Sequence, residues 1–281
     1  MNTQAVIEVA ELSDLLKDPE LVILDCRYDL AQPDAGQGWF AQSHIPRAQY
    51  ASLHGDLSGP HERYGGRHPL PSVEQFAEVA RRLGISADSR VVVYDDQRLA
   101  FAARAWWLLR FFGLGRVSVL NGGFSAWRDA GLPVESGEAQ PVPHGTFAPS
   151  PDPAAVADHW EIYSGLANPA WQLVDARDPA RFDGTDEPMD PVAGHIPSAI
   201  NKPWQENTGE DGRLKSPRAL REHWQDVRSD EPLICYCGSG VTACVNLLSL
   251  HLIGRDDARL YPGSWSDWCA HILHPTSHEA G

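Results

Sequence analysis

The amino-acid sequence predicts an α/β protein built from two tandem domains, each with a parallel sheet covered by helices on both faces. Three observations lead to this prediction. Apolar segments rich in β-branched residues alternate with helical patterns, the first half of the chain is echoed in the second, and a segment rich in Pro, Gly and Ser separates the halves. Strands of a parallel sheet are buried on both faces, so they read as continuous apolar runs, as these segments do.

The internal repeat consists of four pairs of segments that occur in the same order in both halves. Each pair joins a strand-like or turn-like segment to its copy: LVILDCR (21–27) to QLVDAR (172–177), SHIPRA (43–48) to GHIPSA (194–199), RVVVYDD (90–96) to PLICYC (232–237), and NGGFSAW (121–127) to PGSWSDW (262–268). Several matches in one fixed order indicate a duplication.

The expected domain limits follow from the repeat and from composition. We expect an N-terminal domain over residues 1–137, a linker over 138–153 and a C-terminal domain over 154–281. The segment 135–153, ESGEAQPVPHGTFAPSPDP, has the Pro, Gly and Ser content typical of an extended connection. Within the first half, SVEQFAEVARRLG (72–84) predicts a helix with Ser72 as its N-cap and Gly84 as its stop.

Composition and charge exclude several function classes. The 281 residues are 42% hydrophobic and 22% charged, which is typical of a folded globular protein. A net charge of −15 argues against nucleic acid or an anionic membrane as the main partner, and no apolar run reaches the length of a membrane helix. The first twenty residues carry acids in place of the basic start of a signal peptide. Five cysteines do not form a secreted disulfide pattern, so we expect a cytoplasmic, reducing location.

The segment ICYCGSGVTACVNLLSL (234–250) places a cysteine beside a glycine-rich turn. PLICYC (232–237) predicts a buried strand and residues 241–254 a helix, so Cys237 lies at the carboxyl end of a strand, where open α/β sheets bind ligands. Gly238 and Gly240 allow backbone amides to converge there, next to the positive end of the helix. The sequence therefore predicts a nucleophilic thiol and a cradle for an anionic sulfur, with hydroxyl donors from Ser239 and Thr242.

Other interpretations of the cysteines stay open. Cys237 could be a small core residue, but a Gly-Ser-Gly turn contributes little to packing. Cys235 lies near the site or in the core, and the core is favoured. A metal site at Cys235 and Cys237 is disfavoured because no second close ligand pair accompanies them. The remaining thiols are expected to be structural: Cys26, Cys244 and Cys269.

These motifs together resemble the tandem-domain rhodanese-family sulfurtransferases, over nearly the whole chain. The loop CGSGVTA (237–243) is similar to that of the 3-mercaptopyruvate branch, and GHIPSAI (194–200) and GSWSDW (263–268) resemble other fixed stretches of the family. The resemblance implies two rhodanese-like domains, of which the second is catalytic and the first an inactive copy. Asp96 stands as far before Trp127 as Cys237 stands before Trp268, so Asp96 is expected to occupy the matching position.

The resemblance also implies residues that bind the donor. In PARFDG (179–184) it assigns Arg181 to the donor's anionic group, and the loop residues Gly238, Gly240 and Val241 line the same site. The branch usually has a second arginine at the position of Met189, so we expect a higher Michaelis constant here unless Lys202 supplies the charge. A surface role for Lys202 is favoured, and Arg177, like its copy Arg27, is expected in a structural ion pair.

The mercaptopyruvate branch further implies a relay of acid, histidine and serine. Ser239 matches the serine of this relay. His68, in GRHPLP (66–71), matches the histidine. The acid lies in SLHGDLSG (52–59), where His54 and Asp56 are the residues in question.

The function implied is transfer of a sulfane sulfur from 3-mercaptopyruvate, through a persulfide on Cys237, to cyanide or to a thiol acceptor such as a thioredoxin-like protein. Thiosulfate is the alternative small anionic donor. No cofactor, metal, nucleic acid or membrane is expected. A cysteine phosphatase would need an arginine at the position of Ala243, and a non-catalytic sulfur carrier would not need the intact loop.

Overall fold

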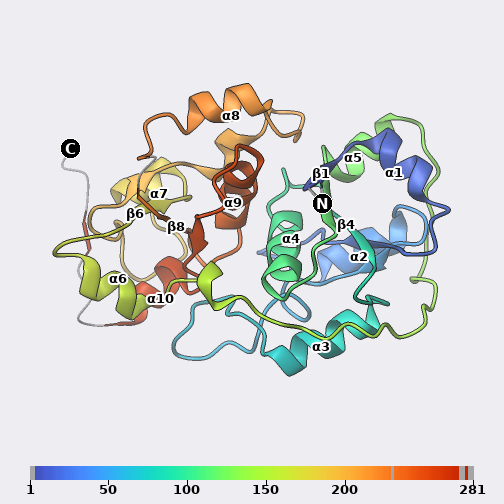
Figure 1. The fold of residues 1–281 in the computed structure, drawn as a ribbon, viewed down its shortest axis with the longest axis horizontal. Coiled ribbons are helices and arrows are strands. Elements are labelled where there is room, and N and C mark those ends of the chain that lie inside the picture. Colours follow the sequence, from blue (N-terminus) through green and yellow to red (C-terminus); the bar gives the residue numbers. More distant parts are fainter. Residues whose placement is uncertain (1–3, 229–230, 272–275, 278–281) are drawn as a thin grey trace. The chain divides into compact units, whose positions relative to one another are not determined.

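The computed structural model describes residues 4–228, 231–271 and 276–277 (Figure 1). The chain forms two compact units. The first combines residues up to Gly59 with Pro71–Asp152 and Thr208–Leu214, and the second combines Pro60–Leu70, Pro153–Asn207 and the chain from Lys215 onward. Each unit thus takes a short segment from the other half of the sequence. The expected limits 1–137, 138–153 and 154–281 contain no such exchange and remain a prediction.

The first unit contains a five-stranded parallel sheet in the order β1-β5-β4-β2-β3. Its strands are β1 (Val6–Ile7), β2 (Leu21–Asp25), β3 (Gln49–Tyr50), β4 (Arg90–Tyr94) and β5 (Val117–Leu120). Its helices are α1 (Val9–Leu15), α2 (Ala35–Gln42), α3 (Val73–Arg82), α4 (Ala102–Phe111) and α5 (Gly123–Asp129). The predicted start of α3 is confirmed, because the Ser72 hydroxyl accepts a hydrogen bond from the Gln75 amide at 3.1 Å.

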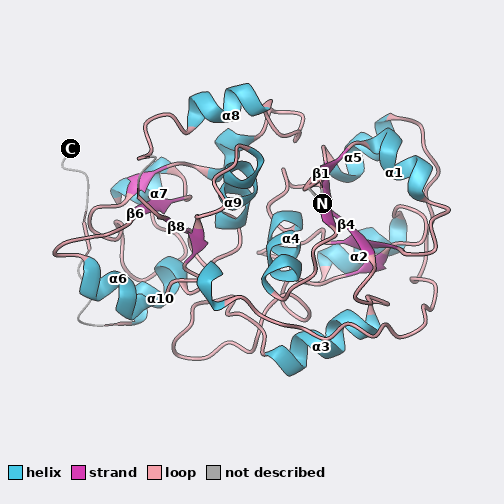
Figure 2. Cartoon of the chain, in the orientation of Figure 1, coloured by secondary structure: helices cyan, strands magenta, loops and turns pink. Residues whose placement is uncertain are grey.

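The second unit contains a four-stranded parallel sheet in the order β7-β6-β8-β9. Figure 2 labels β6 and β8 of this sheet. Its strands are β6 (Gln172–Asp175), β7 (Ile200–Asn201), β8 (Leu233–Tyr236) and β9 (Arg259–Leu260). Its helices are α6 (His159–Gly165), α7 (Pro179–Asp183), α8 (Pro217–His223), α9 (Ala243–Leu252) and α10 (Ser264–Ala270), with short 3-10 turns at Pro153–Ala155 and Trp204–Asn207. The predicted fold class, two domains with parallel sheets flanked by helices, is confirmed.

The duplication extends to individual hydrogen bonds. Arg27 binds the Asp25 carboxylate through Nε and Nη2, and its Nη2 also donates to the Ser43 carbonyl at 2.7 Å. In the second unit Arg177 binds Asp175 in the same way and donates to a carbonyl at 2.7 Å. Both ion pairs are buried, so the expected structural role of these arginines is confirmed.

The strand register corrects the residue that matches Cys237. Tyr94 pairs with Asp25 in the first sheet as Tyr236 pairs with Asp175 in the second, which aligns the residue after each tyrosine, Asp95 and Cys237. The carbonyls of these two residues accept equivalent amide hydrogen bonds at 2.9 Å at the start of α5 and α10. The expectation that Asp96 occupies this position is therefore wrong by one residue, because the following stretch is one residue longer in the first copy.

Within the described ranges, no helix is long and apolar enough to cross a membrane. Each unit instead has its own buried aromatic core around the sheet, with Trp127 fully buried in the first and Trp265 and Trp268 in the second. In both copies the final helix of the repeat supplies these tryptophans, so the turn that precedes it is fixed against the core.

Candidate active site

Cys237 directly follows β8, at the carboxyl end of the strand, as predicted. It is 2% exposed. Its amide donates to the Ser264 hydroxyl at 3.1 Å, and its carbonyl accepts from the Trp265 amide at 2.9 Å. Ser264 is fully buried, has a positive φ of 55° and donates in turn to the Tyr261 carbonyl at 2.9 Å. The backbone around the thiol is thus fixed on both sides by the turn that opens α10.

The loop after Cys237 presents backbone amides that no protein group satisfies. Residues 238–241 are buried, and among the described residues the amides of Gly238, Ser239, Val241 and Thr242 donate to no acceptor. Buried amides are nearly always paired, so four open donors in one loop mark an anion cradle. The N-terminus of α9 lies at the end of this loop and adds positive potential. An arrangement of this kind can hold an anion next to the thiol.

The first unit shows the same kind of loop filled by an anion from the chain itself. Asp95, which matches Cys237, is fully buried. Its carboxylate accepts hydrogen bonds of 2.8–3.0 Å from the amides of Gln97, Leu99, Phe101 and Ala102. Burial raises the pKa of Asp95, while these hydrogen bonds act in the opposite direction. The carboxylate occupies the cradle and cannot accept sulfur, so the first copy lacks the reactive group.

The two glycines of the loop are needed for different reasons. Gly240 has a positive φ of 73°, and a Cβ at this position would collide with the Pro262 carbonyl oxygen. Gly238 has no positive φ. A Cβ on Gly238 would instead lie 3.0 Å from Nη2 of Arg67 and 3.4 Å from both Nη atoms of Arg181. Gly238 therefore makes room for two guanidinium groups beside the cysteine loop.

Gly240→Ala should lower the thermal stability of the protein and reduce sulfur transfer. A non-glycine residue with this φ costs about 1–3 kcal/mol, and the collision with a backbone oxygen adds to that cost. Gly254→Ala is the matched control, since Gly254 also has a positive φ, of 88°, but has open space around its Cβ position. Thermal unfolding should show a clearly larger loss for Gly240→Ala. Equal losses in the two variants would mean that the close approach to Pro262 does not matter.

His68, which the family resemblance singled out, lies against Ser239. Its Nδ1 is 2.9 Å from the Ser239 hydroxyl oxygen, and both residues are 8% exposed. His68 belongs to the segment Pro60–Leu70, which packs within the second unit. Gly66, with a φ of 81°, sits where a Cβ would collide with the Gly263 carbonyl, and the Gly65 amide donates to Asp267 at 2.8 Å. These close contacts bring His68 to the loop.

Arg181, from α7, lies beside the loop with its guanidinium held by two carboxylates. Its Nε and Nη2 bind Glu187 at 2.9–3.2 Å, and Nη2 also binds Asp190 at 3.0 Å. Burial opposes ionisation of Glu187, but the hydrogen bonds from Arg181 and nearby amides hold its pKa below the usual value. Among the described residues, Nη1 of Arg181 has no hydrogen-bond partner, so it remains available to a ligand.

Sequence reasoning missed Arg67, the second guanidinium at this loop. Arg67 precedes His68, and its Nη1 forms an ion pair with Asp190, which also binds Arg181. The only sequence signal was its place next to His68 in the Gly-Gly turn. Met189 is 47% exposed, and its position carries no charge. Lys202 does not replace the charge either, because its ammonium binds Asp226 at 2.6 Å and the His223 carbonyl at 2.9 Å.

Two further predictions concern Thr242 and the acid of the relay. Thr242 is the residue before α9 and is half-buried, and its hydroxyl forms no hydrogen bond with any other described residue. Asp56 forms an ion pair with Arg82 and accepts a hydrogen bond from the Ser52 amide at 2.9 Å, while His54 is exposed. These observations on Asp56 and His54 do not identify the acid partner of His68.

Comparison with known proteins decides the family. The family model described as "Rhodanese-like domain" matches residues 8–130 and 159–271. The chain belongs to the rhodanese-like domain family. It is 42% identical over 282 residues to the "Probable 3-mercaptopyruvate sulfurtransferase" of Pseudomonas aeruginosa, covering 99% of each chain. It is 40% identical over 284 residues to the "Putative thiosulfate sulfurtransferase SseB" of Mycobacterium tuberculosis, covering 97% of this chain and 96% of that protein.

A solved structure agrees with this assignment. The crystal structure of SseA from Escherichia coli, described as showing the rhodanese fold of the 3-mercaptopyruvate sulfurtransferases, matches with a TM-score of 0.83 and 36% identity. The match covers 94% of this rhodanese-family chain and 100% of that one. The resemblance inferred from the loop and the repeat is thereby confirmed.

The other cysteines of this rhodanese-family protein lie away from the open amides of the loop, and burial raises the pKa of three of them. Burial raises the pKa of Cys26 and of Cys235, and both are fully buried. Burial raises the pKa of Cys269 to about 12. Cys244 is fully buried on α9, 3.5 Å from the Gly240 carbonyl. These positions agree with the structural roles expected for Cys26, Cys244 and Cys269, and with Cys235 as a core residue.

One group of possible metal ligands contains none of the residues expected to act on sulfur. Among the described residues, ligand atoms of His159, Asp267 and His271 lie within 4.8 Å of one another. The two imidazole rings stack with centroids 4.0 Å apart and planes 22° apart. Lone pairs in two nearly parallel rings point side by side, whereas a metal ion needs ligands that converge. Asp267 instead fixes the Gly65 amide and the Tyr261 hydroxyl.

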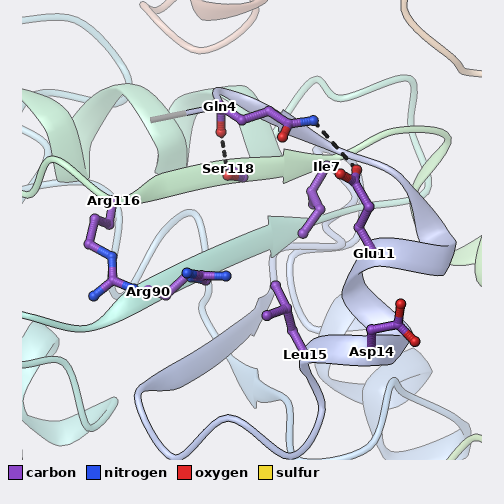
Figure 3. A pocket seen from close by; sticks show the side chains of 8 residues that line it. All are labelled: Gln4, Ile7, Glu11, Asp14, Leu15, Arg90, Arg116 and Ser118. Carbon is purple, nitrogen blue, oxygen red and sulfur yellow. Dashed lines mark hydrogen bonds between the residues drawn. The ribbon is translucent and has the colours of Figure 1, made fainter. Parts of the chain in front are cut away.

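A surface pocket of about 510 Å³ in the first unit has a different character (Figure 3). It lies where β4 and β5 begin, with Arg90 and Arg116 on one side, and not at the carboxyl ends of the strands. Across it the Ser118 hydroxyl donates to the Gln4 carbonyl at 2.5 Å, and the Gln4 amide reaches Glu11 at 3.4 Å. None of the residues expected to act on sulfur lines this pocket.

Proposed function

We propose that this rhodanese-family protein is a sulfurtransferase that takes a sulfane sulfur from 3-mercaptopyruvate, carries it as a persulfide on Cys237 and passes it to a thiol or to cyanide. The observation that carries the proposal is the thiol at the end of β8, followed by a loop of open amides and by the contact between Ser239 and His68. The names of its relatives support the donor.

The first step forms one S–S bond and breaks one C–S bond. The Cys237 thiolate attacks the sulfur of 3-mercaptopyruvate, and the electron pair of the broken C–S bond goes to the carbon, which leaves as the enolate of pyruvate. The donor is held by its anionic group at Arg181 and by the loop residues Gly238, Gly240 and Val241. The step needs no redox cofactor, because the carbon keeps the electron pair of the C–S bond: the donor's carbon is reduced as its thiol sulfur becomes the sulfane sulfur of the persulfide.

The enolate needs a hydrogen-bond donor and then a proton. Ser239 follows the thiol by two residues, and its hydroxyl can donate to the oxygen on which negative charge develops. His68, 2.9 Å from that hydroxyl, supplies the proton through it, and protonation at carbon gives pyruvate. This relay would serve only a donor that leaves as an enolate.

The persulfide is anionic, and the loop stabilises it. The open amides of Ser239, Val241 and Thr242, with the Thr242 hydroxyl, surround the position of its outer sulfur. Asp95 supports this role by analogy, since four amides of the matching loop bind its carboxylate. Persulfide formation thus places an anionic sulfur where the first copy holds the Asp95 carboxyl group.

The second step returns the enzyme to its starting state. An acceptor thiolate, for example from a thioredoxin-like protein in the cytoplasm, attacks the outer sulfur, and the electron pair of the S–S bond returns to Cys237. Cyanide would take the sulfur in the same way and give thiocyanate. Donor and acceptor therefore react in turn at one thiol, which gives ping-pong kinetics.

Thiosulfate is the second candidate donor, and one observation favours it. Arg67 and Arg181 both lie beside Gly238, which provides two cations for a doubly charged donor. The 40% identical relative from Mycobacterium tuberculosis bears that donor in its name. With thiosulfate the leaving group is sulfite, so neither Ser239 nor His68 has a proton to supply.

A comparison of steady-state rates decides between the donors. We expect a higher kcat/KM with 3-mercaptopyruvate than with thiosulfate, because the contact between Ser239 and His68 assists only the former. Arg181→Ala should lower kcat/KM with both donors about 10- to 100-fold, since each loses a charge-assisted bond of roughly 1.5–3 kcal/mol. Arg218→Ala, which removes a surface arginine that is 88% exposed, is the control. A faster reaction of the wild type with thiosulfate would reverse the assignment.

A further inference from the structure

We propose that the surface pocket of the first unit binds a basic amino acid, such as free arginine, through its carboxylate and its two cationic groups. The pocket measures about 510 Å³, within the usual range for a small-molecule site. Figure 3 shows Arg90 and Arg116 on one side of it and Glu11 and Asp14 of α1 on the other. The inference goes beyond the proposed function, because it gives the copy without a reactive thiol a binding role of its own.

The pocket lies where the core packing on one face of the sheet stops. The strand register puts the side chains of Arg90, Arg116 and Ser118 on the same face. Further along this face, Leu120 is buried in one core cluster with Leu12 of α1. Polar side chains therefore replace apolar ones at the start of β4 and β5, and they line a pocket beside the helix.

The helix at the pocket has a counterpart in the second unit. α1 and α6 have seven residues each, and each begins directly after an acidic N-cap, Glu8 in the first copy and Asp158 in the second. Each helix carries a glutamate at its third residue, Glu11 in α1 and Glu161 in α6. These two carboxylates therefore occupy equivalent places in the repeat.

The strand beside the helix has a counterpart as well, and one residue differs. Ser118 of β5 pairs with Val92, two residues before the tyrosine aligned above. Arg259 of β9 pairs with Ile234, which stands at the same place in the second copy. Both Nη atoms of Arg259 donate to the Glu161 carboxylate, Nη1 at 3.0 Å, so an arginine joins sheet and helix there. In the first copy a short serine replaces it, and the pocket is open at this point.

The carboxylates of α1 are left without the cation that the second copy supplies. Oε2 of Glu11 accepts hydrogen bonds from the Glu8 amide at 2.9 Å and from the Gln4 side chain at 3.4 Å. Among the described residues, its Oε1 accepts none, and the Asp14 carboxylate has no partner. The residue of α6 that matches Asp14 is Ser164, so the first copy carries an additional acid here. A guanidinium or ammonium group of a ligand would pair with these oxygens.

The arginines supply the opposite charge. Arg90 and Arg116 stand opposite each other on neighbouring strands, where like charges repel. Arg116 is paired with Glu20 at 2.9 Å, whereas the Arg90 guanidinium has no partner in the described part of the chain. The matching residues of the second sheet are Pro232 and Asp257, so the fold does not require two arginines here. A bound carboxylate would relieve the repulsion and fit the fork of Arg90.

The balance of charges selects the class of ligand. Arg90 is one cation that needs an anion, and Glu11 and Asp14 are two anions that need cations. A basic amino acid matches this set with one carboxylate, one ammonium and one side-chain cation. A neutral amino acid would leave one of the acids unpaired, and a diamine would leave Arg90 unpaired. Ile7 and Leu15 give the aliphatic part of the side chain an apolar surface.

Calorimetric titration of the full-length protein with arginine tests the proposal. We expect arginine to bind at one site per chain. Citrulline, which has no charge on its side chain, and agmatine, which has no carboxylate, should bind at least about tenfold more weakly, because each loses a charge-assisted bond. Lysine should bind with an affinity closer to that of arginine than to that of citrulline.

Paired variants assign each end of the ligand. Arg90→Gln should weaken the binding of arginine at least about tenfold and leave the binding of agmatine unchanged. Glu11→Gln should weaken arginine equally and leave citrulline unchanged, and glutamine at this position preserves the capping box of α1. The controls are Arg221→Gln and Glu74→Gln, which neutralise exposed residues on α8 and in the first turn of α3 and should bind arginine as the wild type does.

Ser118→Arg imitates the second copy and closes the pocket. Its guanidinium should pair with Glu11 as Arg259 pairs with Glu161, so arginine binding should be lost while the melting temperature stays equal or rises. The proposal is overturned if the wild type binds neither arginine nor lysine, if citrulline and agmatine bind as tightly as arginine, or if Ser118→Arg binds like the wild type. If Arg90→Gln does not fold, the comparison of agmatine with arginine on the wild type decides. Sulfur transfer is measured separately, so failure of the proposed function leaves these binding results unaffected.

Discussion

Cys237→Ser is expected to reduce sulfur transfer to background with every donor while the protein stays folded. A serine oxygen cannot form a persulfide, and loss of the nucleophile in enzymes that form covalent intermediates typically costs about 10⁴-fold or more in rate. Ser264 and Trp265 hold the backbone at this position, so a side chain of similar size should leave the loop intact. Steady-state assays with 3-mercaptopyruvate and with thiosulfate measure the rate.

Mass spectrometry provides the direct test. Wild-type protein treated with donor should gain the mass of one sulfur atom on the peptide that contains Cys237, and Cys237→Ser should gain none. Cys235→Ala is the control, because burial keeps that thiol protonated two residues earlier on the same strand. Near wild-type transfer by Cys237→Ser, or sulfur found on Cys235 alone, would show that the nucleophile has been misassigned.

Strand and turn positions in the sequence were enough to predict the fold and the thiol's place in it. Apolar strands such as Leu233–Tyr236 are buried on both faces, and the repeat places each Asp-x-Arg motif at the same edge of its sheet. Cys237 then had to follow a strand and precede a helix. These are local patterns, which are recognised from neighbouring residues without knowing which distant segments pair.

The positions of matching residues were harder to predict. Counting back from Trp127 gave Asp96, but hydrogen-bond register between strands sets equivalence in a sheet, and it selects Asp95. A one-residue difference in a connection shifts every count made across it. The correction has a functional consequence, since the buried carboxylate of Asp95 fills its loop, whereas Asp96 is exposed.

Contacts over long sequence separations account for what the sequence did not show. Arg67 and Asp190 are far apart in the chain, and only tertiary packing of Pro60–Leu70 within the second unit brings them together. A lone arginine has no periodicity and no motif, so nothing in the sequence distinguished Arg67 from a surface residue. His68 was found only through a family resemblance, and its contact with Ser239 depends on the same packing.

His68→Ala and Ser239→Ala should each lower kcat with 3-mercaptopyruvate by about 10²- to 10³-fold, the usual size of a general acid's contribution, and leave kcat with thiosulfate within about threefold. The reason is the leaving group, since an enolate must be stabilised and protonated and sulfite need not be. The pair should act as a unit because the Ser239 hydroxyl connects His68 to the substrate. The double variant, which combines His68→Ala and Ser239→Ala, should therefore lower kcat with 3-mercaptopyruvate little more than either single change.

The control for these variants is His61→Ala, which removes an exposed histidine from the same segment, Pro60–Leu70, and should leave both reactions unchanged. Single-turnover kinetics with each donor isolate persulfide formation from transfer to the acceptor, so a loss in that phase with 3-mercaptopyruvate alone would locate the effect in proton delivery. An equal loss with thiosulfate would instead mean that His68 and Ser239 shape the loop around Cys237. If the loss of kcat in the double variant equals the product of the two single losses, His68 and Ser239 act separately. In a relay, removing one member already stops proton delivery, so removing the second should lower kcat little further.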